Sequence, residues 1–157
     1  MTIHQCNLSV SIEDVRQLYR RHFPGVAAAL EGTLLAGLTA PDVAFGQGTV
    51  SLSAKKRVPL LGELTAAVRV RPSAAADGHT LRLTLEKIVA GPLETGTLAK
   101  LVMSRIGTAI AAIPGCRVDG NALLVDLAAL TAAKGVELGG CVTAVDMLPD
   151  AIAISVA

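Results

Sequence analysis

The sequence predicts an α+β fold: a strongly curved antiparallel β-sheet, connected as a meander, packs around one long apolar helix, with a shorter N-terminal helix. Apolar and polar residues alternate from Val50 to the end, which is typical of strands that bury one face. One long apolar helical pattern interrupts the alternation, and short turn signals separate the strands. The alternating segments are residues 50–54, 64–71, 81–86, 122–127 and 151–156.

Length and composition indicate one globular domain. A chain of 157 residues can bury its own core, and no linker divides it, so we expect a single domain over residues 1–157. Hydrophobic residues make up 52% and aromatic residues 2%, so the core must be aliphatic. Few aromatic rings and a net charge of +1 argue against a nucleic-acid partner, because proteins that bind nucleic acids stack bases on aromatic rings and neutralise phosphates with basic side chains.

The first elements are a strand and a helix. Residues 6–10 predict a short strand, and Ser11 is a candidate N-cap followed by Glu13 and Asp14, which the helix dipole favours. Ile12, Val15, Leu18 and Tyr19 share one face of this helix. We expect Pro24-Gly25 to end or kink it.

Three strands joined by turns follow as a meander. Residues 43–58 predict one long strand with a flexible point at residues 46–48, and residues 59–62 form the turn. Residues 63–71 predict the second strand, residues 72–78 a polar loop, and residues 79–90 the returning strand.

The apolar helix is predicted over residues 97–113, before Pro114-Gly115. Its apolar residues recur at steps of three and four and cover a wide arc, so the helix needs apolar partners on most sides. A concave sheet would supply them.

The C-terminal part returns to strands. Residues 119–121 predict a turn, residues 128–135 either a short helix or an extension of the preceding strand, and residues 136–147 and 151–156 further strands.

Motifs for catalysis or metal binding do not stand out. His4 and Cys6 would share a strand face, but no second pair follows at ligand spacing, so we expect no metal and no cofactor. The three cysteines (Cys6, Cys116 and Cys141) suggest buried reduced thiols, or one disulfide and a free thiol. An acid pair of Asp126 and Asp146 would require their strands to pair. We therefore expect a protein that is not an enzyme.

Basic residues follow the polar side of the meander. The meander should gather Lys55, Arg57, Arg69, Arg71 and Arg82 on one outer surface, relieved by Glu63 and Glu86. Such a surface is either a solvated face that discourages edge aggregation or a contact for anionic headgroups or an acidic partner.

Three segments carry a resemblance to a known family: G-E-L-T-A-A-V-R-V-R (62–71), L-R-L-T-L-E-K-I (81–88) and R-V-D-G-N-A-L-L-V-D-L (117–127). Over residues 43–157 the chain resembles the tubular lipid-binding proteins, including bacterial phospholipid-binding relatives. The resemblance implies a curved sheet beside a long helix, a lipid ligand and no catalytic residues.

We therefore expect non-enzymatic binding of a lipid or other apolar small molecule in a cleft between the long helix and the concave sheet. The expected ligand-binding residues are Leu81, Leu83, Leu85, Leu98, Leu101, Val102, Arg105, Ile106 and Ile110. Arg105 would either extend along its stem to the surface or meet a ligand anion at the mouth of the cleft. The alternative is a structural or protein-interaction module with a packed core and no ligand, homodimeric through sheet edges or the strand of Ile152, Ile154 and Val156.

Further partners follow from the same observations. The basic surface predicts peripheral contact with an anionic membrane. The N-terminus has neither the basic nor the apolar region of a secretory signal, so we expect a cytoplasmic protein, or one of the cell envelope if a signal was removed.

Overall fold

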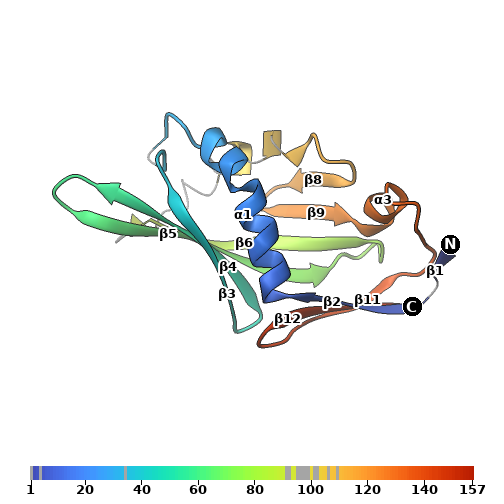
Figure 1. Cartoon of the computed structure of the whole chain (residues 1–157). Coiled ribbons are helices and arrows are strands. Elements are labelled where there is room, and N and C mark those ends of the chain that lie inside the picture. The colour runs from blue at the N-terminus through green and yellow to red at the C-terminus, as the bar shows by residue number, and fades with distance from the viewer. Residues whose placement is uncertain are drawn as a thin grey trace.

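The computed structural model describes residues 2–3, 5–33, 35–90, 93–94, 100, 103–105, 107–108 and 110–157, with only the backbone at residues 2–3 and 93–94. The fold is mostly β, with 51% of the chain in strands. A large antiparallel sheet extends to one side, and a smaller sheet lies below it (Figure 1).

The large sheet has seven strands in the order β3-β4-β5-β6-β9-β8, and β7 pairs with the end of β6. Its strands are β3 (Thr39–Gly46), β4 (Thr49–Val58), β5 (Gly62–Ala74), β6 (Thr80–Ala90), β7 (Leu93–Glu94), β8 (Cys116–Asp119) and β9 (Ala122–Asp126). Each pair is antiparallel. The expected meander is confirmed, and it includes one more strand than the sequence predicted.

The smaller sheet brings the two ends of the chain together. Its order is β11-β12-β2, from β2 (Cys6–Ser11), β11 (Val142–Met147) and β12 (Ala151–Val156), and both pairs are antiparallel. β1 (Thr2–Ile3) pairs in parallel with β10 (Glu137–Leu138). A short helix, α3 (Leu127–Ala132), follows β9 and begins with the side chain of Asp126 accepting from the Ala129 amide.

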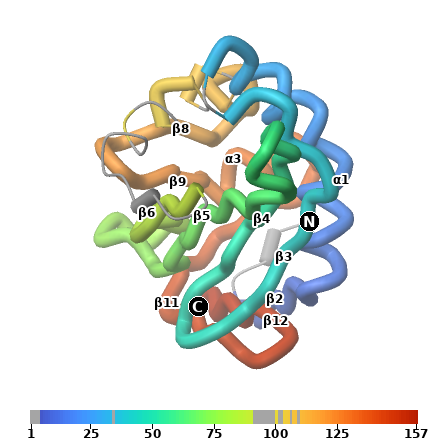
Figure 2. Tube along the Cα trace, turned by 90° about the vertical axis from the view of Figure 1, so that its left-hand side faces the viewer, coloured from blue at the N-terminus to red at the C-terminus, as the bar shows by residue number. Residues whose placement is uncertain are grey.

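Helix α1 (Ile12–Ala29) crosses one side of the large sheet (Figures 1 and 2). Ser11 caps it, as the sequence predicted, and Asp14 completes a reciprocal capping box. Pro24 lies inside the helix, so of the two expected effects of Pro24-Gly25 an end of the helix is wrong, and a kink stays a prediction. Arg16 Nη2 donates a hydrogen bond to the backbone carbonyl of Val43 at 3.2 Å. This bond gives a carbonyl of the edge strand β3 a partner.

Strand register assigns one apolar and one polar face to the meander. Leu52, Val68 and Ile88 lie opposite one another across β4, β5 and β6. The neighbouring cross-strand row consists of Ser51, Arg69 and Lys87, whose side chains point to the other side. The alternation in the sequence therefore predicts the faces of these strands correctly.

Two core clusters cover the apolar face. In the first, Leu85 and Ile88 of β6 pack with Leu30 and Leu35, which follow α1. The second lies in the smaller sheet and is built from Val142, Ile154 and Val156, with Leu81 of β6 packed against it. β6 thus contributes to both clusters.

These clusters explain why the predicted fold class is wrong. The large sheet is not strongly curled, and no long apolar helix packs on it in the described part of the chain. The segment after α1 and the smaller sheet cover the apolar side of β6 instead. The longest helix among the described residues is the N-terminal α1, which was expected to be the shorter one. Within the helix predicted over residues 97–113, residues 100, 103–105, 107–108 and 110 are helical, and residues 97–99, 101–102, 106 and 109 lie outside the described residues.

The predicted strand over residues 43–58 is two strands. Gln47 and Gly48 connect β3 to β4 with positive φ angles of 49° and 73°, as in a type I′ hairpin turn. The prediction of a flexible point within one strand at G-Q-G is therefore wrong, because these residues form the turn between two strands. Residues 136–147 are likewise divided into β10 and β11.

Among the helices described, none combines the length and apolar character required to cross a bilayer.

Candidate functional site

The turn between β4 and β5 projects beyond its neighbours. β4 and β5 pair as far as Val58 and Gly62. The pairing of β3 with β4 reaches only to Lys55, and that of β6 with β5 reaches only to Ala66. Beyond these residues the arm is two-stranded in the described structure, and it extends at the left of Figure 1.

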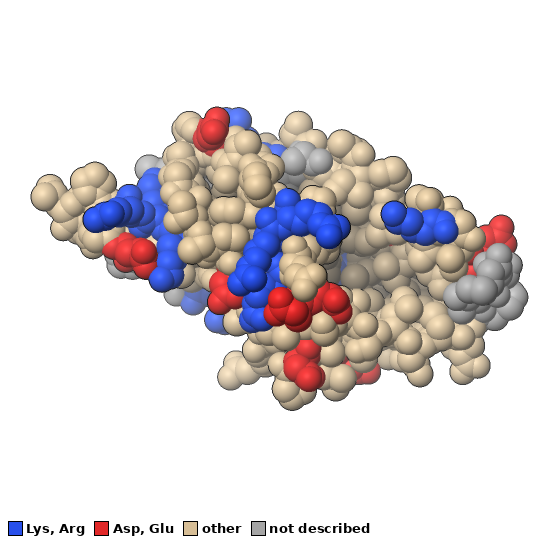
Figure 3. Space-filling view, in the orientation of Figure 1, with Lys and Arg blue, Asp and Glu red and all other residues tan. Residues whose placement is uncertain are grey.

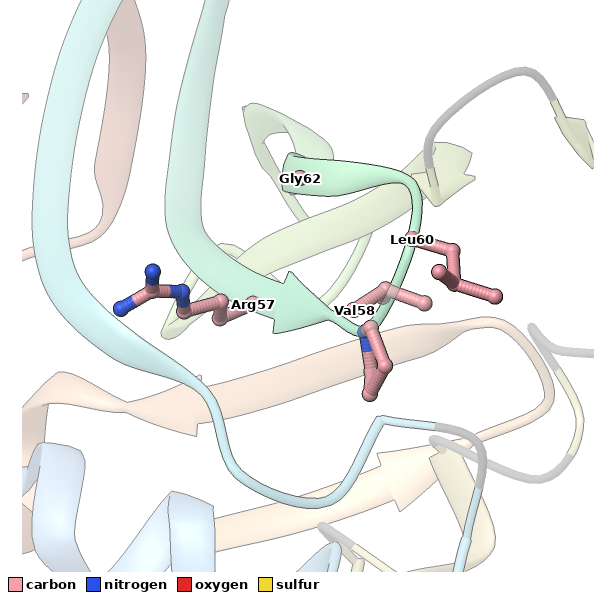
Figure 4. A pocket seen from close by; sticks show the side chains of 5 residues that line it. Arg57, Val58, Leu60 and Gly62 are labelled. Carbon is pink, nitrogen blue, oxygen red and sulfur yellow. The ribbon is translucent and has the colours of Figure 1, made fainter.

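The end of this arm, residues 58–62, is apolar and exposed; we call it the hairpin tip. Leu60 has a relative exposure of 105% and Leu61 of 71%. An open hollow of about 530 Å³ lies beside Leu60, and its lining also includes Arg57 and Val58. In Figure 4 the side chains of Arg57 and Leu60 point away from each other. Water therefore contacts most of the side-chain surface of two adjacent leucines.

Charged residues lie directly behind the hairpin tip. Lys55 Nζ lies 2.7 Å from Glu63 Oε1, and this hydrogen bond raises the pKa of the lysine above its ordinary value. Arg57 is exposed on the same side of β4 and makes no ion pair with a described residue. Figure 3 shows tan atoms at the left end of the molecule with blue and red atoms behind them.

The predicted basic surface is confirmed by the register of the meander. We call it the basic face: Lys55, Arg57, Arg69, Arg71, Arg82 and Lys87, which share one side of β4, β5 and β6. Lys55 pairs with Glu63, Arg71 with Glu86 and Arg82 with Asp119, whereas Arg57 and Arg69 make no ion pair with a described residue. The face therefore retains a surplus of positive charge, which suits an anionic partner.

Of the predicted ligand residues of β6, Leu85 is buried, whereas Leu81 and Leu83 are half-buried. Leu81, Leu83 and Leu85 share one face, as their spacing predicts. Leu85 is buried in the first cluster, while Leu81 contacts the second. The structure thus places them on one strand but in different packing environments, and their contact with a ligand stays a prediction.

The predicted helix residues are only partly described. Leu98, Leu101, Val102 and Ile106 lie outside the described residues. Arg105 is exposed and Ile110 is half-buried. The exposure of Arg105 agrees with the expectation that its side chain reaches solvent.

The remaining candidates for chemistry are dispersed. Asp126 lies in β9 of the large sheet and Asp146 in β11 of the small one, so the strand pairing that an acid pair required does not occur. All three cysteines are free thiols, but none is buried as expected, because Cys6 and Cys116 are half-buried and Cys141 is exposed. His4 lies outside the described residues, and within the described ranges no three potential ligands gather as a metal site would require.

Sequence reasoning missed Leu60 and Leu61, although a signal was present. Turns between strands are ordinarily polar, and P-L-L-G places two leucines between two alternating segments. An apolar pair in a tight turn can pack on a neighbouring element or remain exposed, and only the tertiary structure distinguishes these outcomes. Comparison of the chain with protein families, curated protein sequences and solved structures gives no match.

Proposed function

We propose that the protein binds lipid without catalysis, by inserting the hairpin tip into the surface of an anionic membrane. The exposure of Leu60 and Leu61 at the end of a projecting arm is the observation that carries this proposal. Exposed apolar groups beside cations are typical of peripheral membrane contacts, because acyl chains take the apolar part and headgroups take the charge.

Magnitudes indicate which part of the arm dominates binding. A leucine side chain that is fully removed from water contributes about 1.5–3 kcal/mol. A cation close to an anionic leaflet contributes about 1 kcal/mol. Leu60 and Leu61 together therefore outweigh Arg57, and the positive charge serves mainly to select the membrane.

A lipid held between a long helix and a concave sheet is no longer the preferred geometry. That cleft depended on a fold that the structure contradicts. The surface site requires no enclosed cavity, and it retains the expected ligand class and the predicted membrane contact.

The proposal is tested by sedimentation with vesicles made of equal parts phosphatidylcholine and phosphatidylglycerol. We expect the wild-type protein to sediment with these vesicles and the double variant Leu60→Ser/Leu61→Ser to remain in solution. Leu148→Ser is the matched control, because Leu148 is also an exposed leucine beside a proline, in the turn between β11 and β12. It should bind as the wild type does.

Equal binding by the double variant and the wild-type protein would reject the hairpin tip as the lipid site. Vesicles of phosphatidylcholine alone provide a second comparison, since loss of the anionic lipid should weaken binding without abolishing it. Arg57→Gln should produce a smaller loss than the double variant.

The alternative function is a protein-interaction module with two predicted interfaces, and the strand of Ile152, Ile154 and Val156 is not available as one of them. β12 is paired on both sides, and Ile154 and Val156 are buried in the chain's own core. Dimerisation through a sheet edge stays a prediction. Sedimentation velocity over a range of protein concentrations tests it, and a monomer at high concentration would count against it.

A further inference from the structure

A second hollow lies at the opposite end of β4 from the hairpin tip. It has a volume of about 360 Å³, and its polar lining includes Gln47, Ser51, Arg69, Arg71 and Glu86. Eight residues separate Leu61 from Arg69, which is about 26 Å along an extended strand. The Debye length at physiological salt is only about 8 Å, so salt screens the electrostatic attraction between this hollow and headgroups bound at the hairpin tip.

The turn between β3 and β4 and a bulge in β6 shape the hollow. The bulge falls where Arg69 pairs with Lys87 and Val70 with Leu85, which leaves Glu86 as the extra residue. Glu86 accepts a hydrogen bond from Arg71 Nε. Arg71 Nη1 lies 2.9 Å from the position that a Cβ on Gly48 would occupy. Arg71 is therefore held between a carboxylate and the backbone of the turn.

Arg69 differs from Arg71 because its charge is not neutralised locally. It is exposed, and its guanidinium forms no ion pair or hydrogen bond with any residue that the structure describes. Ser51 lies directly opposite it on β4, in the same hollow. A planar guanidinium and a hydroxyl on adjacent strands can donate together to the oxygens of one anion.

We propose that this hollow binds the phosphate or carboxylate group of a soluble small molecule. Arg69 supplies the free guanidinium, Ser51 a hydroxyl donor, and Arg71 an oriented second cation. Glu86 holds Arg71 in place but its negative charge repels the anion. Arg69, Arg71 and Glu86 together give the hollow a net charge of +1. This site is independent of the lipid contact at the hairpin tip.

Titration with inorganic phosphate, followed by the NMR shifts of the arginine side-chain N–H groups and of the amides of residues 47–51, tests the proposal. We expect saturable shifts confined to this region. Arg69→Gln should weaken binding about tenfold or more, because it removes a charged hydrogen-bond donor. Glu86→Gln should strengthen binding, since it removes the opposing charge and retains an oxygen acceptor for Arg71.

Arg117→Gln is the matched control, because Arg117 is an exposed arginine on β8 of the same sheet, outside the hollow. It should leave the affinity unchanged. Shifts that do not saturate, or equal losses in the Arg69 and Arg117 variants, would overturn the proposal. The Leu60→Ser/Leu61→Ser variant should bind phosphate normally, so failure of the lipid contact and failure of this site give different results.

Discussion

Tyr19 shows how one residue reports the packing of α1 on the sheet. It is the single tyrosine of the chain. Its hydroxyl donates to the carbonyl of Ser53 at 3.4 Å, and its ring meets the ring of Phe23 edge-on with centroids 5.5 Å apart. Burial disfavours the phenolate and raises the pKa of Tyr19 to about 12.

We predict that the ultraviolet absorbance of the tyrosine titrates near pH 12 in the folded protein and near pH 10 in urea. Because the folded-state pKa lies above the unfolded value of 10.0, the associated stability is fully present below pH 10. It is lost as the pH rises towards about 12. The chain has no tryptophan to obscure the signal. A folded-state midpoint near 10 would show that Tyr19 is not buried against the sheet.

The same helix shows a limit of prediction at the residue scale. Helical spacing places Leu18 beside Tyr19 on the predicted apolar face, and the structure leaves Leu18 exposed. Spacing identifies the residues that share a face, but the width of the contact with β3 determines which of them are covered.

At the scale of elements, the turn between β3 and β4 is the feature that the sequence analysis did not predict. Its two central residues have positive φ angles, and the guanidinium of Arg71 lies against Gly48. A side chain at Gly48 would strain the backbone and displace this guanidinium. Gly25 of α1 has neither constraint, because nothing lies within 4 Å of its Cβ position.

We predict opposite effects of alanine at these two glycines. Gly48→Ala should lower the free energy of unfolding by about 1–2 kcal/mol, the usual cost of a left-handed conformation for a residue with a side chain. Gly25→Ala should raise it by about 0.5–1 kcal/mol, because alanine favours helix over glycine. Urea denaturation followed by circular dichroism measures both. Equal changes in the two variants would contradict the type I′ turn.

At the scale of the whole molecule, β6 joins the two core clusters. Leu85 packs in the first cluster and Leu81 against the second. Loss of either cluster would expose apolar side chains of the same strand. If residues 1–157 form a single domain, as expected, the two clusters should unfold together.

We predict a single unfolding transition shared by both clusters. Ile154→Val perturbs the second cluster and should lower the free energy of unfolding by about 0.5–1.5 kcal/mol. The fluorescence of Tyr19, on the helix whose later turns contact the first cluster, should shift together with circular dichroism. Two transitions, with the fluorescence midpoint unchanged, would mean that the clusters unfold separately.

The sequence by itself determined the strands β5 and β6 of the meander, the side that each of their residues faces, and the cap of α1. These properties depend on alternation and on local hydrogen bonds, and both operate within a few residues. The gathering of Arg57 and Arg69 on one face followed from the same local rule.

Only the tertiary structure decided what covers the apolar face and what remains exposed. Alternation shows that Leu81 and Leu85 need apolar neighbours, but a helix, a second sheet or a loop satisfies that need equally well. The exposure of Leu60 depends in the same way on how far the neighbouring strands extend. Strand pairing over long separations sets these lengths, and no local pattern encodes them.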